Sequence, residues 1–182
     1  MSKKLKMILA VTVILVGAYF IHLALKDDVQ EINKAVFSLN QQNTNIAHIE
    51  FLDNKQAIAF YEWGAHDNLH FGSAIFKKNL LGWKFVHGST GTLDHGYKLD
   101  WGFSNLEFEL SGYTDLIRGK ILDPRIVEVT VQTTNGNEFK ANVIDYNKDE
   151  KFWFLVSGGE DLLGSTITGM SSDGEMIEQI IQ

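Results

Sequence analysis

The sequence of 182 residues contains no cysteine and a single proline, Pro124. Without cysteine the chain has no disulfide bond, no thiol nucleophile and no attachment point for the lipid of a bacterial lipoprotein, so its fold depends on an apolar core. Fingerprints of common enzymes are also missing, since there is no P-loop, no dinucleotide-binding glycine motif and no G-x-S-x-G nucleophile elbow. These absences exclude several familiar enzyme classes.

Acidic residues dominate the chain after its first segment. All 23 Asp and Glu residues follow Lys26, whereas only 12 of the 16 Lys and Arg residues do. A surface this acidic is repelled by nucleic acid and by anionic lipid headgroups. The composition therefore predicts no nucleic-acid partner and no binding to a lipid surface outside the first segment.

The first segment is apolar. Residues Met7–Leu25 carry no formal charge, and as a helix they would span about 28 Å, close to the hydrocarbon thickness of a bilayer. A cleaved signal peptide is the alternative, but His22 stands where a small residue is needed before the candidate cleavage site. Lysines precede the run, which keeps that side cytoplasmic. The sequence predicts a cytoplasmic tail over 1–6 and a transmembrane helix over 7–25. The predicted localisation is the cell membrane, single-pass, with a cytoplasmic N-terminus and an extracellular C-terminal domain.

Residues 26–45 form a juxtamembrane helix and linker in this prediction. Asp28 and Glu31 have the spacing of a capping box, and apolar residues follow at helical spacing. We expect an amphipathic helix over 28–42. It ends in the polar run of residues 40–45, whose side chains favour turns.

From residue 46 the apolar pattern changes to a period of two. About ten short strands follow at intervals of roughly 8–12 residues, which predicts a mainly β domain over 46–182, an antiparallel β-sandwich or barrel-like fold. Turns are expected at Asp53-Asn54, at Asn79–Gly82 and, in type I′ form, at Asn135-Gly136. Two meanders, at about 46–88 and 126–170, would form the two sheets.

Two patterns suggest metal sites, but neither fits one well. His66 and His70 are four residues apart, but the glycines on either side favour a loop, where this spacing does not bring the imidazoles together. Residues 145–149 begin like a calcium loop, but Glu150 stands where glycine is required. The sequence predicts no metal site and no cofactor.

No catalytic residues are predicted either. Glu107 and Glu109 lie two apart and could act as paired carboxylates, the arrangement that glycoside hydrolases use. Their alternation with Leu106, Phe108 and Leu110 predicts instead a half-buried strand with both carboxylates on its solvated face.

Aromatic residues are more informative. Most of them fit the core of a sandwich, because an aromatic side chain buries about 150–250 Å². Four others fall in a glycine-rich loop where a core position is hard to assign, namely His95, Tyr97, Trp101 and Phe103. An exposed aromatic loop is a typical recognition surface, so these four are the predicted ligand-binding residues.

Several segments resemble a family of small membrane-anchored or secreted proteins from Bacillus-type Gram-positive bacteria. They are AIAFYEW (57–63), KKNLLGWKFVHG (77–88), GKILDPRIVEVTV (119–131), KFWFLV (151–156) and GMSSDGEMI (169–177). The similarity covers roughly residues 30–180. It implies an extracytoplasmic β domain in the cell envelope, and because the shared motifs are packing and turn signatures, it transfers no functional residues.

Together these features predict a non-enzymatic binding or interaction module at the cell surface, held in the lipid bilayer through residues 7–25. Its partner would be a cell-surface protein or polysaccharide. The alternative is a cell-envelope hydrolase that uses carboxylates in a surface cleft, which a cluster of buried carboxylates would favour. A third possibility is an accessory subunit that pairs through its membrane helix.

Overall fold

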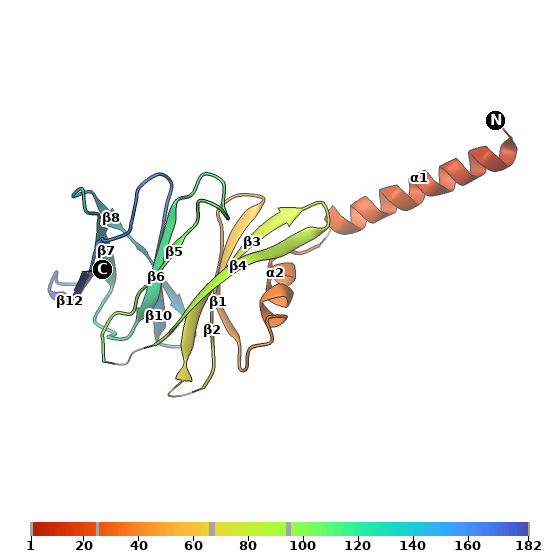
Figure 1. Ribbon diagram of the computed structural model, residues 1–182. Coiled ribbons are helices and arrows are strands. Elements are labelled where there is room, and N and C mark those ends of the chain that lie inside the picture. Colours follow the sequence, from red (N-terminus) through yellow and green to blue (C-terminus); the bar gives the residue numbers. More distant parts are fainter. Residues whose placement is uncertain (1, 25, 66–67, 94–95, 182) are drawn as a thin grey trace.

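The computed structural model describes residues 2–24, 26–65, 68–93 and 96–181. It begins with helix α1 (Lys3–Ala24), which projects away from the rest of the protein as a separate rod (Figure 1). Within the described residues, no helix is long and apolar enough to cross a membrane. The predicted span over 7–25 includes Leu25, which lies outside the described residues, and this span stays a prediction.

Helix α2 (Asp28–Phe37) confirms the predicted amphipathic helix but is shorter than expected. Its N-cap is Asp27, not Asp28, and the Asp27 carboxylate accepts hydrogen bonds from two backbone amides of the first turn. The helix stops before residue 42 because Asn40 adopts a left-handed conformation with a φ of 60°.

The described residues form twelve strands in three antiparallel sheets of four strands each. Sheet A is a meander of β1 (Asn45–Phe51), β2 (Gln56–Trp63), β3 (His70–Asn79) and β4 (Gly82–Thr92). Sheet B has the order β5 (Gly102–Asn105), β6 (Asp115–Ile121), β10 (Glu150–Ser157) and β9 (Asn142–Tyr146). Sheet C has the order β12 (Met176–Ile181), β11 (Thr166–Met170), β7 (Glu128–Gln132) and β8 (Glu138–Lys140).

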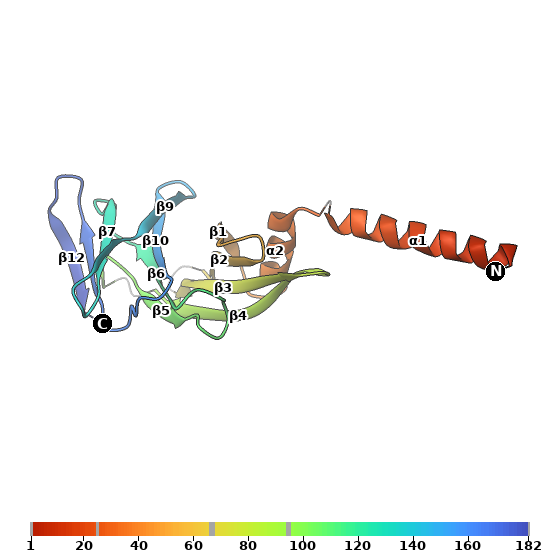
Figure 2. The same cartoon turned by 90° about the horizontal axis from the view of Figure 1, so that it is seen from above.

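The elements stack in layers, in the order α2, sheet A, sheet B and sheet C, with α1 at one end of the stack (Figures 1 and 2). Strand alternation supplies the cores between the layers. In β2, Ala57 and Ala59 face α2, where Ile32 is fully buried, whereas Ile58 and Phe60 face sheet B. Small side chains on the helix side let α2 approach the sheet closely.

Sheet B is covered on both faces, and its central strands show this in their sequences. All seven residues of β6 are buried. Leu116 packs in the core shared with sheet A, and Ile117 packs in the core shared with sheet C. In β10, Phe152 packs in the core shared with sheet A, and Trp153 packs in the core shared with sheet C. The predicted mainly β, antiparallel, sandwich-like fold is confirmed, with three stacked sheets in place of two.

The grouping of residues 126–170 into one sheet is wrong. The chain leaves sheet C at Ala141, which is buried between the sheets, and continues as β9 of sheet B. The Asn135-Gly136 hairpin does form between β7 and β8, but only Gly136 has a positive φ, of 90°. The Gly136 amide donates to the Thr133 carbonyl, so the turn is not type I′.

The strand predicted around Leu106 is also wrong. Strand β5 ends at Asn105, and the following residues form a turn in which the Leu110 amide donates to the Leu106 carbonyl at 2.7 Å. Both leucines are buried between sheets A and B, and Phe108 is exposed. Leu106 and Leu110 are four residues apart, so they lie on the same side of this turn. The same spacing would also place them on one face of a strand, and this is why the sequence pattern fitted a strand.

Candidate functional site

The predicted aromatic surface falls on the connection between β4 and β5. Tyr97 and Trp101 are exposed there, to 55% and 39%. Phe103 lies in β5, half-buried, and packs against the core between sheets B and C. His95 lies outside the described residues. The structure therefore leaves two of the predicted residues on the surface of one segment and turns a third toward the core.

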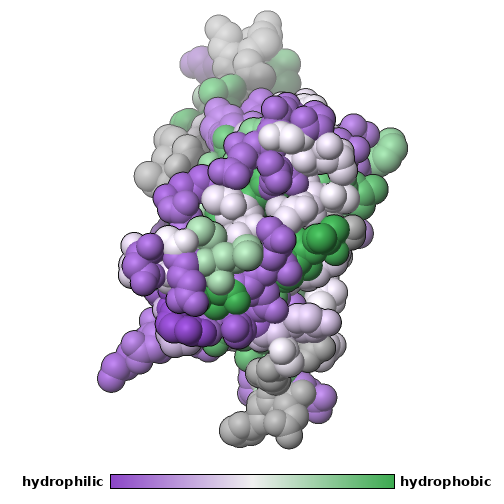
Figure 3. Space-filling view, turned by 90° about the vertical axis from the view of Figure 1, so that its left-hand side faces the viewer, coloured by the Kyte–Doolittle hydropathy of each residue, from purple (hydrophilic) through white to green (hydrophobic). Residues whose placement is uncertain are grey.

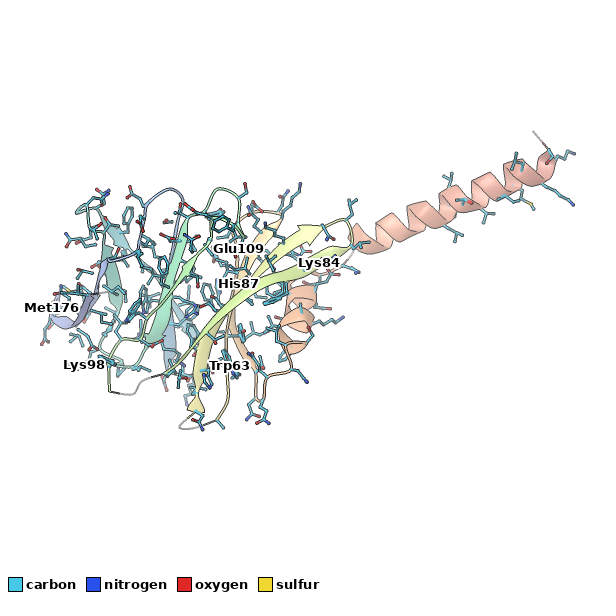
Figure 4. The ribbon with its side chains drawn as sticks, viewed as in Figure 1. Trp63, Lys84, His87, Lys98, Glu109 and Met176 are labelled. Carbon is cyan, nitrogen blue, oxygen red and sulfur yellow. The ribbon has the colours of Figure 1, made fainter. Side chains whose placement is uncertain are left out.

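The segment between the two exposed aromatics is held firmly. Leu99 is fully buried in the core between sheets B and C. The backbone amides of Lys98 and Leu99 both donate to Oε2 of Glu178 in β12. Figure 4 shows Lys98 at one rim of the stacked sheets. Tyr97 and Trp101 thus project from a backbone anchored to sheet C.

A glycine makes room for the same segment against sheet B. The Asp100 amide donates to the Lys120 carbonyl at 2.9 Å, and the Asp100 carbonyl accepts from Nε1 of Trp153 at 3.0 Å. A Cβ on Gly119 would lie 1.7 Å from the Asp100 carbonyl oxygen. Glycine inside a buried strand is a sequence signal for such a close backbone approach, and the sequence prediction did not use it.

The most unusual chemistry lies between sheets A and B. Lys120 of β6 is only 4% exposed, and its Nζ lies 2.9 Å from Oε2 of Glu62 in β2. Lys120 also donates to the hydroxyl of Tyr146 in β9, and that hydroxyl donates to Glu62 Oε2 at 2.8 Å. These three residues, the buried ionic network, connect the two sheets through side chains.

Polar neighbours complete the network. Asn45 donates to the other oxygen of Glu62 at 3.0 Å. Glu150 lies 3.2 Å from Lys120 Nζ and accepts a hydrogen bond from Asn147 at 2.7 Å. Both carboxylate oxygens of Glu62 and the lysine charge are therefore satisfied inside the protein.

The surroundings shift the pKa values of Glu62 and Tyr146 in opposite directions. Burial by itself would raise the pKa of Glu62, but hydrogen bonds from Asn45, Lys120 and Tyr146 outweigh it and lower that pKa. Burial raises the pKa of the Tyr146 phenol, and the nearby Glu62 charge raises it further. At neutral pH Glu62 is ionised and Tyr146 is neutral. The arrangement suits a link between sheets better than proton transfer.

Arg118 is a second buried cation on the same face of β6. Its Nε donates to Ser73 Oγ at 2.8 Å, and one Nη donates to the Ser89 carbonyl at 2.6 Å. Burial lowers the pKa of Arg118 to about 10, so the guanidinium keeps its charge at neutral pH. The residue joins β6 to β3 and β4 of sheet A.

The hydrolase alternative needs carboxylates in a surface cleft, and the candidates are Asp115, Glu107 and Glu109. Burial raises the pKa of Asp115, but this residue is 1% exposed and its two oxygens accept from the Leu162 amide and the Asn105 side chain. Glu107 and Glu109 lie in the turn after β5, so strand alternation no longer places them on one face. Asp115 is therefore inaccessible, and the strand face expected to carry Glu107 and Glu109 does not form.

The described residues of the two patterns that resemble metal sites lie in a strand and in a tight turn. His70 begins β3, and its ring stacks on Trp63 with centroids 5.0 Å apart, whereas His66 lies outside the described residues. Asn147 and Asp149 both have positive φ in the tight turn between β9 and β10. Over the part of the chain that the structure describes, no three His, Asp or Glu side chains are grouped to hold a metal ion.

The chain matches no protein-family model, no curated protein and no solved structure. The resemblance to the Bacillus-type family therefore stays a prediction, and the functional argument rests on the chain's own geometry.

Proposed function

We propose that this protein is a single-pass, membrane-anchored β domain that acts as a non-enzymatic binding module on the outer side of the cell membrane. The observation that carries the binding role is the pair Tyr97 and Trp101, exposed on a segment fixed by the burial of Leu99. A rigid backbone presents aromatic faces at a low entropic cost on binding.

Membrane anchoring is proposed from the uncharged run Met7–Leu25 and the lysines before it. Within helix α1 the Thr12 hydroxyl donates to the Ile8 carbonyl, so this polar side chain needs no water. On this proposal the tail over 1–6 is cytoplasmic, and α2 with the three sheets is extracellular.

The proposed partner offers a flat apolar surface that stacks on indole and phenol rings. A sugar ring of a cell-surface polysaccharide or an apolar patch on a surface protein would meet this requirement. The acidic character of the domain disfavours nucleic acid.

Photo-crosslinking in intact cells tests the binding role. A benzophenone amino acid at position 97 of the full chain should give a discrete adduct that weakens when Trp101 is also replaced by alanine. Position 108 is the matched control, because Phe108 is an exposed aromatic on a different turn. Identical adducts from both positions, or none from position 97, would contradict the proposal.

Anchoring has its own test. Mass spectrometry of the mature protein should find the first 25 residues still attached, and a reporter fused after Gln182 should be accessible from outside the cell. A mature chain that begins after Leu25, or a reporter located in the cytosol, would refute the anchored arrangement.

A further inference from the structure

The β3–β4 hairpin ends in two exposed leucines. Leu80 and Leu81 form its tip and are 81% and 62% exposed. Asn79 starts the turn, with its side chain accepting from the Leu81 amide at 2.8 Å, and Gly82 ends it with a φ of 114°. Turn tips usually carry polar residues, so two adjacent leucines at the most exposed point of a hairpin need an explanation.

The same hairpin has a charge opposite to that of the whole chain. Residues 70–92 contain three lysines and no Asp or Glu, whereas the chain has a net charge of −7. Strand register places Lys77 opposite Lys84, a like-charge pair that destabilises a hairpin. Neither lysine forms an ion pair with a described residue. Two exposed, unneutralised cations beside apolar side chains are suited to an anionic partner.

The tip lies at the end of the domain from which α1 leaves, in both ribbon views (Figures 1 and 2). Figure 4 places Lys84 on that side as well. An ion pair of 2.6 Å joins Lys78 to Asp28, the first residue of α2 and only four residues after the end of α1 at Ala24. Leu80 is two residues beyond Lys78, a distance of about 7 Å along a strand.

We propose that this tip is a second membrane contact. Leu80 and Leu81 enter the boundary between headgroups and acyl chains, and Lys77 and Lys84 bind the phosphates of anionic lipids. The inference rests on the proposed anchor, because α1 brings the tip to the bilayer surface. The opposite end of the domain carries hydrophilic residues interspersed with apolar ones (Figure 3).

The acidity of the remaining surface supports one orientation. Anionic lipid repels the acidic parts of the domain and attracts the lysines of the hairpin, so the domain is held with this tip toward the membrane. The anchor limits the distance from the bilayer, and the hairpin limits rotation about the anchor.

The absence of cysteine allows a direct test on the full chain. A Leu80→Cys variant carries a single label with an environment-sensitive fluorophore, in vesicles of phosphatidylglycerol and phosphatidylcholine with brominated acyl chains. We expect emission at shorter wavelength and strong quenching by the bromine. Leu163→Cys is the matched control, because Leu163 is an exposed leucine on the connection to β11 and should report water.

Two further variants separate the tip from the anchor. A label at Ile14→Cys reports whether α1 lies in lipid. A quenched label at position 14 with an unquenched label at position 80 would overturn the inference and leave the anchor standing. An unquenched label at position 14 would refute the anchor, whatever the label at position 80 reports.

Charge provides the second readout. Lys77→Gln with Lys84→Gln, added to Leu80→Cys, should reduce the quenching, as should replacing phosphatidylglycerol by phosphatidylcholine. The control pair Lys140→Gln with Lys148→Gln removes the same charge outside the hairpin and should have no effect. Equal quenching in all these samples would contradict the role of the lysines.

Discussion

Replacing Lys120 by methionine removes the cation that neutralises Glu62 between sheets A and B. The carboxylate then stays buried with hydrogen bonds only from Asn45 and Tyr146, because Lys120 supplied its ionic partner. Breaking a buried pair by removing one partner costs about 3–5 kcal/mol. Domains of this size are stable by about 5–15 kcal/mol. The substitution should therefore remove a large fraction of the free energy of unfolding.

The stability of the natural protein and that of Lys120→Met should depend on pH in opposite directions. In the natural protein the pKa of Glu62 is lowered, so its contribution to stability is full above its unfolded value near 4.5 and is lost as the pH falls through the folded pKa. In Lys120→Met the hydrogen bond and the charge of the lysine no longer oppose the effect of burial, and we expect the pKa of Glu62 to rise above its ordinary value. The variant should then lose stability as the pH rises through that folded pKa, and its deficit should be smallest in acid.

Urea unfolding of the full chain in detergent, followed by tryptophan fluorescence, measures both effects, because all four tryptophans lie beyond residue 60. The control combines Glu62→Met, Lys120→Met and Tyr146→Phe, which leaves no buried charge in the network. Its stability should equal or exceed that of the natural protein. A cost below about 1 kcal/mol for Lys120→Met, as for an exposed ion pair, would refute the reasoning.

Three other substitutions and one control, Val29→Ala, test the packing and the charge of the core. Gly119→Ala should destabilise the domain by about 3 kcal/mol or more in urea unfolding, because its Cβ would overlap the Asp100 carbonyl; a neutral result would contradict the close approach. Ile32→Ala should cost about 2–5 kcal/mol, whereas Val29→Ala on the exposed side of α2 should cost less than about 0.5 kcal/mol. Burial raises the pKa of Asp115 above its ordinary 3.8. Its contribution to stability is therefore full below that pH and is lost as the pH rises through the folded pKa. Asp115→Asn should lack this pH dependence of the free energy of unfolding, measured from pH 3 to 7.

Local signals in the sequence were enough for most strands and for the first sheet. Alternation and turn residues predicted the β1–β2 and β3–β4 hairpins, which form from neighbouring segments. Assignment to sheets B and C was not predictable, because the paired residues of β6 and β10 lie 30 to 42 positions apart and Ala141 moves the chain from one sheet to the next. Long-range pairing leaves no local pattern.

The candidate sites were predictable in part for the same reason. Tyr97 and Trp101 were identified because a glycine-rich loop carries its own signal, whereas Phe103 was assigned to that loop and lies in a strand. The ionic network joins residues up to 84 positions apart, so Glu62 and Tyr146 could not be matched in advance. Overall acidity likewise concealed the basic hairpin, because a net charge averages over surfaces that point in different directions.

The order of the layers has a mechanical consequence. A partner that pulls on sheet C of an anchored domain would load the interfaces between the sheets one after another, and it would separate side chains rather than shear the hydrogen-bonded ladders within each sheet. In the interface between sheets A and B, such a force acts on Lys120 and Glu62, which join the two sheets by a charged contact. If the proposed anchoring and binding hold, that contact lies on the path along which tension would be transmitted.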